Sequence, residues 1–195
     1  PPPPPSFFLM IRRPPRSTTL YSSASSDVYK RQSITKSLDP AKGSVQKLYA
    51  EDTNLTIFQE LKINTALIDK DAIYTQEGQA VSTASNVVIG GIVPYAGEYG
   101  ISTNPESFAR FGYRKYFADR TKNLVLRLSQ DGITEISMYG MVDFFRDKLA
   151  QAGNNAPVIG GYDMHNKQYV ISIQVPSTET VTFDEAVKGW TSRFS

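Results

Sequence analysis

Cysteine is absent from this 195-residue sequence, and histidine occurs once, at His165. Without cysteine the chain has no disulfides, no cysteine-ligated zinc or iron–sulfur cluster and no thiol nucleophile. A single histidine also removes metal sites built on two histidines and most histidine relays. No apolar run reaches the roughly 18 to 20 residues that a membrane helix needs. The sequence therefore predicts no cofactor and no membrane contact, and it leaves few routes to catalysis.

The first 32 residues differ in composition from the rest, because they hold seven of the twelve prolines. Their charged side chains are five bases and one acid: Arg12, Arg13, Arg16, Lys30, Arg31 and Asp27. The basic pI of about 8.8 therefore comes from this leader, and we predict no nucleic-acid binding by the remainder. Its apolar run precedes the arginines and is too short for a secretory signal.

Two interpretations of this leader stay open. Sequence rich in proline and serine buries too little apolar surface to offset chain entropy, which is typical of a disordered arm. The string FFLMIRRPPRSTTLYSSASSDVYKRQ resembles instead the translated read-through of a sequencing adapter. We therefore divide the chain into a non-native or disordered leader at 1–32 and a β-rich domain fragment at 33–195. We expect the chain to be a fragment at both ends, and truncated at its C-terminus.

Short runs of β-branched and aromatic residues, separated by turn residues, fill the chain from Leu55 onward. Residues 55–59 and 87–93 are predicted strands, since both are too short for buried helices. In the middle of the chain, residues 124–129 and 133–137 flank Asp131-Gly132, which predicts a β-hairpin.

Residues 107–118 precede this hairpin and alternate with a period of two, so they are predicted to be one strand. The turn from this strand into the hairpin is expected at 119–123. Together these segments predict a three-stranded meander.

One short amphipathic helix is predicted near 141–150. Its apolar residues recur at helical spacing: Met141, Phe144, Phe145 and Leu149. Gly153 and Pro157 then end the helix.

The C-terminal part predicts two further hairpins. Residues 162–173 form a strand, a polar turn and a strand, and a second pair of strands flanks the turn at 184–189. The units 107–137 and 158–194 begin roughly 50 residues apart, a spacing that suits β-propeller blades. The predicted fold is all-β, made of antiparallel meanders that form incomplete propeller blades. A β-sandwich is the alternative.

Candidate catalytic residues are few. His165 lies in the polar turn 163–167 and could act as a general base, but no G-x-S-x-G motif accompanies it, so we interpret it as a solvated turn residue. Asp184 and Glu185 are neighbours that point to opposite faces of an extended chain, which makes them a poor catalytic pair. We expect no catalytic residues and no enzymatic activity.

Metal and nucleotide motifs are also lacking. Counted from Asp69, an EF-hand loop needs ligands or glycine where this chain has Ile73, Tyr74 and Ala80, so Asp69, Asp71 and Glu77 are not predicted to bind calcium. The glycines form neither G-x-G-x-x-G nor a P-loop; they are Gly90, Gly91, Gly97 and Gly100. Asn54-Leu55-Thr56 matches a glycosylation triplet, which means little without a signal peptide.

Aromatic residues are dense between positions 95 and 117. They are Tyr95, Tyr99, Phe108, Phe111, Tyr113, Tyr116 and Phe117. A stacking surface for sugars or bases is one interpretation, and packing in the core and between sheets is the favoured one for most of them.

Several strings resemble virion structural proteins of tailed bacteriophages, particularly large tail- or neck-associated proteins with β-propeller-like repeats. They are residues 54–60, 66–74, 97–102, 104–108 and 127–137, and Phe183-Asp184-Glu185 followed by Lys188-Gly189-Trp190. The resemblance covers about 53–194. It implies a non-enzymatic role in tail or neck assembly, in which Trp190 is architectural and no catalytic residue carries over.

That resemblance also implies the setting. The partners would be other virion proteins and copies of the same chain, and the protein would assemble in the host cytoplasm and reside in the virion. The alternative function is a carbohydrate-binding or carbohydrate-active β-propeller, whose exposed tyrosines would line a pocket near Asp163, His165 or Asp184.

Overall fold

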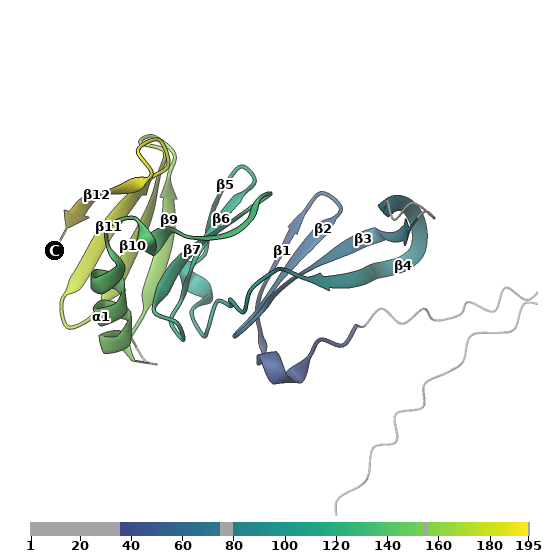
Figure 1. Cartoon of the computed structure of the whole chain (residues 1–195), viewed down its shortest axis with the longest axis horizontal. Helices are drawn as coiled ribbons and strands as arrows, with labels where there is room; N and C mark the ends of the chain where they lie inside the picture. Colours follow the sequence, from purple (N-terminus) through teal and green to yellow (C-terminus); the bar gives the residue numbers. More distant parts are fainter. Residues whose placement is uncertain (1–35, 75–79, 154–155, 195) are drawn as a thin grey trace, which may run out of the picture. The chain divides into compact units, whose positions relative to one another are not determined.

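The computed structural model describes residues 36–74, 80–153 and 156–194. Within these residues, twelve strands form three antiparallel sheets of four strands each. The strands of every sheet follow one another in chain order (Figure 1). This arrangement confirms the predicted all-β fold of antiparallel meanders. The leader at 1–32 and Glu77 lie outside the described residues.

The N-terminal sheet contains two predicted strands and two that were not predicted. Its strands are β1 (Val45–Glu51), β2 (Asn54–Gln59), β3 (Ile63–Tyr74) and β4 (Ala80–Pro94). The predicted strand 55–59 falls in β2, and 87–93 falls in β4. Asp69 and Asp71 lie within β3, not in a loop. A short 3₁₀ turn, η1 (Pro40–Lys42), precedes the sheet, and the Asp39 side chain accepts a hydrogen bond from the Ala41 N–H at 2.9 Å.

The central sheet corrects one prediction. Its strands are β5 (Ala109–Phe111), β6 (Arg114–Asp119), β7 (Leu124–Ser129) and β8 (Gly132–Glu135). The single strand predicted at 107–118 is wrong, because the chain reverses at Gly112 and pairs Phe111 with Arg114. Gly112 has a φ of +55°, a conformation that a residue without Cβ adopts at little cost. The period-two pattern continued across this turn and concealed it.

The hairpin predicted after it is confirmed, with a shift of one residue. Ser129 pairs with Gly132, so the turn residues are Gln130 and Asp131 rather than Asp131 and Gly132. Gly132 has a φ of +103°, which explains why glycine stands at this position. The second strand ends at Glu135, and a 3₁₀ turn, η3 (Ile136–Met138), follows it.

The C-terminal sheet and the helix match their predictions. The helix α1 (Val142–Ala152) buries Phe145 and Leu149. The sheet consists of β9 (Val158–Asp163), β10 (Gln168–Gln174), β11 (Thr178–Asp184) and β12 (Gly189–Phe194). In the part of the chain that the structure describes, no helix has the length and hydropathy needed to cross a membrane.

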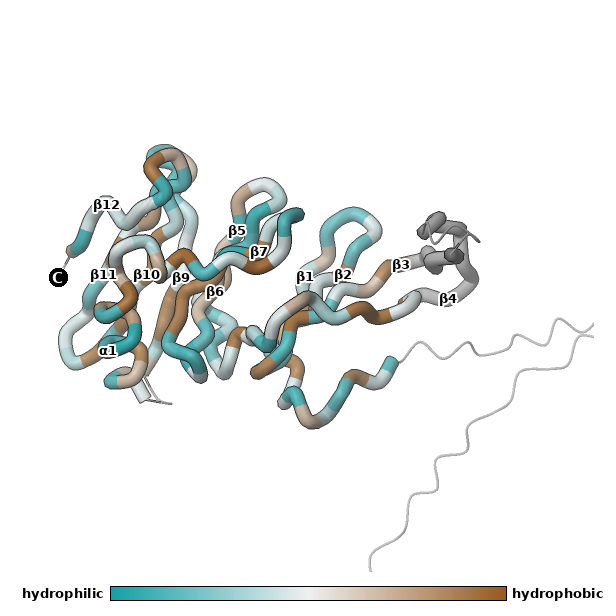
Figure 2. Tube along the Cα trace, viewed as in Figure 1, coloured by the Kyte–Doolittle hydropathy of each residue, from teal (hydrophilic) through white to brown (hydrophobic). Residues whose placement is uncertain are grey.

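Both faces of the central sheet are buried. Along β6, Tyr116 and Ala118 point into one core and Phe117 points into the other; along β7, Val125 and Leu126 alternate in the same way. This follows from the alternation of side chains along a strand. In Figure 2 the hydrophobic residues follow the strands, while most hairpin turns are hydrophilic.

Two cores result from this arrangement. The C-terminal core joins the central sheet, α1 and the C-terminal sheet, and its largest members are Tyr116, Phe145, Leu149, Tyr169, Ile171 and Phe183. The N-terminal core joins the central and N-terminal sheets through Phe58, Ile63, Ile101, Phe117, Leu126 and Leu128. The three sheets therefore stack face to face, with the central sheet covered on both sides.

Candidate functional site

The single histidine lies in the exposed turn between β9 and β10. The Asp163 carboxylate accepts hydrogen bonds from Asn166 Nδ2 at 2.7 Å, from the Asn166 N–H at 3.2 Å and from the His165 N–H at 2.9 Å. These bonds lower the pKa of Asp163, because they stabilise the ionised carboxylate. Asp163 therefore closes its own turn, and His165 lies where a solvated turn residue was predicted.

Asp184 and Glu185 diverge, as their positions in the sequence predicted. Asp184 accepts a hydrogen bond from the Ala186 N–H at 2.7 Å within its own turn. Glu185 instead reaches the central sheet, where its carboxylate accepts a hydrogen bond from Tyr116 Oη at 2.7 Å and pairs with Arg127 Nη1 at 2.7 Å. Burial and the bond to Glu185 raise the pKa of Tyr116, so its phenol remains a donor. The Glu185 carboxylate thus links two sheets.

A further carboxylate, that of Glu179, connects the helix to the C-terminal sheet. Glu179 on β11 is 4% exposed, and its oxygens lie 2.5 Å from Lys148 Nζ on α1 and 2.6 Å from Arg193 Nη2 on β12. The bond to Lys148 and the charge of Arg193 lower the pKa of Glu179. This ion-pair cluster joins three elements through one side chain.

We expect Glu179→Gln to lower the free energy of unfolding at neutral pH by about 1 kcal/mol. Because the folded-state pKa of Glu179 is lowered, its contribution is complete above the unfolded value and is lost as the pH falls below 4.5. Urea unfolding across this pH range should therefore show a shallower acid loss in the variant than in the parent. Equal pH slopes for the two proteins would contradict the role of this carboxylate.

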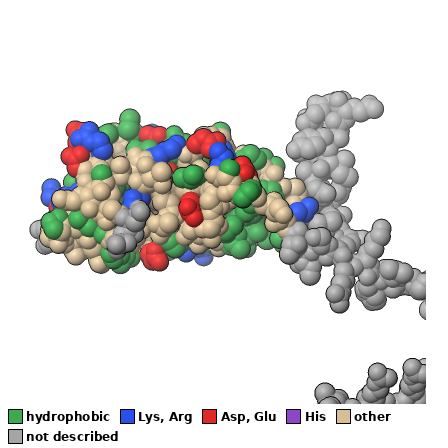
Figure 3. Space-filling view, turned by 90° about the horizontal axis from the view of Figure 1, so that it is seen from below, with side chains coloured by type: hydrophobic (Ala, Val, Ile, Leu, Met, Phe, Trp, Pro, Cys, Tyr) green, Lys and Arg blue, Asp and Glu red, His purple; other side chains and the backbone are tan. Residues whose placement is uncertain are grey.

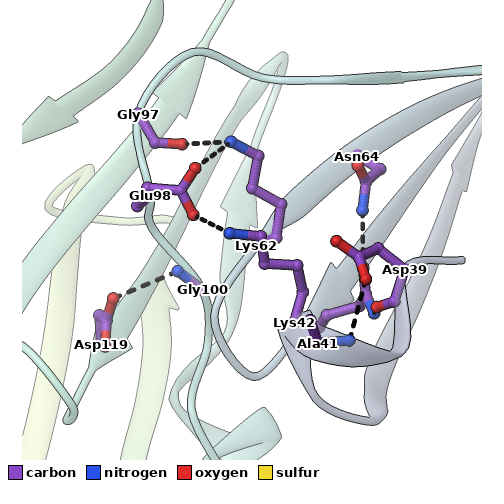
Figure 4. A network of polar contacts seen from close by, with 10 residues as sticks. Asp39, Ala41, Lys42, Lys62, Asn64, Gly97, Glu98, Gly100 and Asp119 are labelled. Carbon is purple, nitrogen blue, oxygen red and sulfur yellow. Dashed lines mark hydrogen bonds and ion pairs between the residues drawn. The ribbon is translucent and has the colours of Figure 1, made fainter.

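Asp119 holds the loop that leads from the N-terminal sheet to the central sheet. Its carboxylate, 1% exposed, accepts hydrogen bonds from the Gly100 N–H at 3.2 Å and from Ser102 Oγ at 2.9 Å. Burial raises the pKa of Asp119. The contact between Asp119 and Gly100 is drawn in Figure 4.

The same loop is held from the other side by two lysines. Lys62 Nζ donates to the Gly97 carbonyl at 2.7 Å and lies 3.2 Å from Glu98, and Lys42 Nζ lies 2.6 Å from Glu98 (Figure 4). Both lysines lower the pKa of Glu98. These polar contacts hold the loop between the two sheets, so the charged residues here have a structural role.

A cleft of about 320 Å³ lies between the N-terminal and central sheets, beside the turns of the β1–β2 and β5–β6 hairpins. Its lining includes Glu51, Asn54, Tyr95, Tyr113, Lys115 and Gln130. Lys115 Nζ lies 2.7 Å from Glu51 Oε2, and the Lys115 side chain is 8% exposed. Two further hollows, of about 310 and 560 Å³, also adjoin Tyr113. Chemically, the cleft offers aromatic, amide and hydroxyl groups around one ion pair.

The lining of this cleft includes only some of the residues that the sequence analysis singled out for a sugar-binding pocket. Of the seven aromatic residues singled out, Tyr113 is exposed and the others are buried or half-buried, as the packing interpretation predicted for most. The lining of the cleft includes Tyr95 and Tyr113, but not Asp163, His165 or Asp184. Its acidic and amide residues, Glu51 and Gln130 among them, were missed, because hairpin turns distant in sequence bring them together.

The described residues contain no group of three or more histidine and carboxylate side chains that could hold a metal ion. The cleft described above, lined by aromatic, amide and charged side chains, is a candidate binding site.

No protein-family model matches the chain. No curated protein matches its sequence either.

Proposed function

We propose that this chain is a non-enzymatic structural protein of a tailed-phage virion, taking part in tail or neck assembly. The resemblance of strings such as residues 54–60 and 127–137 to such proteins supports this role. The stack of consecutive four-stranded meanders is also what propeller blades would provide. In this proposal its partners are other virion proteins and further copies of itself, which it meets in the host cytoplasm.

One face of the N-terminal sheet carries the proposal. Residues paired across antiparallel strands share a face, and two such rows turn away from the N-terminal core. We call their accessible apolar members the outer apolar patch: the exposed Leu48 and Ala50 on β1, and the half-buried Leu55 on β2 and Ile92 on β4. Ile57 and Ala66 lie in the same rows but are buried. Leu48, on the edge strand β1, is 58% exposed. Figure 3 shows hydrophobic side chains gathered toward the end of the described chain that holds this sheet.

Elsewhere in the described residues, apolar sheet faces are covered by other sheets. Apolar faces of the central sheet are covered on both sides by neighbouring sheets. Leaving apolar surface in water is unfavourable, and exposed apolar patches mark interaction sites. The outer apolar patch is therefore suited to receive another sheet.

The opposite end of the stack has a different character. The outward face of the C-terminal sheet is rich in hydroxyl groups, with Thr180 Oγ1 donating to Ser172 Oγ at 3.2 Å and Thr182 Oγ1 lying 3.1 Å from Thr191 Oγ1. A head-to-tail stack of copies would set this polar face against the outer apolar patch. Patch-to-patch contact between two copies buries apolar surface on both sides, so we favour a two-fold pair.

A lysine at Leu48 should abolish this self-association. The variant Leu48→Lys places a charge at the most exposed apolar side chain of the patch, and we expect at least about tenfold weaker association than in the parent chain. Light scattering on the full chain over a range of concentrations measures the molar mass. Thr180→Lys, on the outward face of the C-terminal sheet, is the matched control and should associate like the parent. A parent that stays monomeric, or a Leu48→Lys chain that associates equally well, would contradict the proposal.

A further inference from the structure

We propose that the cleft around Tyr113 binds a neutral saccharide. This activity goes beyond assembly, and the surface it uses shares only Ala50 with the outer apolar patch. The three hollows at this end of the sheets share Tyr113, so its ring is accessible from several sides. A groove with neighbouring compartments suits a chain of several sugar units better than one small ring.

Tyr113 is presented to solvent on a tight turn. It stands in a two-residue turn in which Gly112 has a φ of +55° and the flanking residues Phe111 and Arg114 pair. Phe111, two residues earlier, stacks on Tyr162 with ring centroids 4.4 Å apart and planes 5° apart, which ties the hairpin to the C-terminal core. Tyr113 itself is 64% exposed. A large aromatic side chain fixed on a supported hairpin, yet left out of the core, is well placed to meet a ligand.

The groups around the ring match the chemistry of a sugar. The π-face of tyrosine carries partial negative charge and attracts the weakly positive C–H groups on one face of a sugar ring. Asn54 and Gln130 each provide amide donors and acceptors, and Thr56 and Thr65 provide hydroxyl groups. Sugar hydroxyls need such mixed donors and acceptors. A cleft of about 320 Å³ is also in the range of small-molecule sites.

The charges around Tyr113 balance, which favours an uncharged ligand. Three carboxylates and three bases line the three hollows: Glu51, Asp52, Asp131, Arg110, Arg114 and Lys115. Glu51 and Lys115 already neutralise each other at 2.7 Å. A phosphate or sulfate group would therefore meet no net positive field, and an ammonium group no net negative one.

The experiment is saturation-transfer NMR followed by calorimetric titration of the full chain. The probes are neutral hexose and N-acetylhexosamine oligosaccharides, with sulfated oligosaccharides of equal length as charged counterparts. We expect the parent chain to bind at least one neutral probe and to bind the sulfated ones at least tenfold more weakly. Tyr113→Ala should reduce the affinity for the neutral probe at least tenfold. Its thermal midpoint should stay unchanged, because the side chain is mostly exposed.

Phe194→Ala is the matched control, since Phe194 is an aromatic side chain of similar exposure, 60%, on β12. It should bind like the parent. Absence of binding to every neutral probe would overturn the proposal, and so would equal affinity in the Tyr113→Ala chain or a preference for sulfated probes. A chain that self-associates but binds no sugar would overturn this inference and leave the assembly role standing.

Discussion

Phe117→Ala is expected to lower the free energy of unfolding by about 3–5 kcal/mol. Phe117 on β6 is fully buried, and its ring lies edge-on to Phe58 of the N-terminal sheet with centroids 5.3 Å apart. Truncation removes this contact and leaves a cavity between two sheets, which neither sheet can close without moving its strands. Urea unfolding followed by tyrosine fluorescence or circular dichroism measures the loss.

Phe194→Ala is the control for this substitution too, because it removes the same side chain from a position 60% exposed. It should change the free energy of unfolding by no more than about 0.5 kcal/mol. Equal effects for the two variants would show that Phe117 is not buried between the sheets.

Gly160→Ala should be similarly severe, with a loss of about 3 kcal/mol or more. A Cβ on Gly160 would lie 1.9 Å from the Ser107 carbonyl oxygen, an atom of the backbone that cannot rotate away. The same oxygen accepts a hydrogen bond from Tyr169 Oη at 2.8 Å, inside the C-terminal core. Forcing Ser107 aside would leave this buried phenol unpaired, which adds to the steric cost.

Gly161→Ala is a closely matched control, since a Cβ at that position meets nothing within 4 Å. Differential scanning calorimetry should find its thermal midpoint close to that of the parent and well above that of Gly160→Ala. Equal thermal midpoints for the two variants would show that β9 does not approach the Ser107 carbonyl closely.

Much of the fold follows from local patterns. The helix was predicted because Phe145 and Leu149 recur at helical spacing, and both are buried. The β7–β8 hairpin was predicted because glycine follows Asp131 between two alternating runs, and Gly132 does have a positive φ. In these cases the residues that form an element also lie next to one another in the sequence.

What could not be predicted depends on contacts between distant segments. Phe117 and Tyr116 are neighbours on one strand, so their side chains point to opposite faces of the central sheet. Both are buried because another sheet covers each of these faces. The sequence predicted that Glu185 points away from Asp184 but not where it goes, because its partners Tyr116 and Arg127 lie in another sheet. The cleft around Tyr113 likewise forms where turns from different hairpins meet, so no single sequence motif could predict it.

The central claim is that copies of this chain pair through the outer apolar patch, and a spin-label distance measurement tests it most directly. Because the chain contains no cysteine, Val45→Cys provides a unique labelling site at the start of β1, beside the patch. Gln174→Cys, at the exposed end of β10, labels the opposite end of the stack. Pulsed electron resonance should find a short, narrow distance between Val45 labels of two copies and only a long or unmeasurable one between Gln174 labels. The reverse pattern, or no dipolar coupling from either label, would contradict the account.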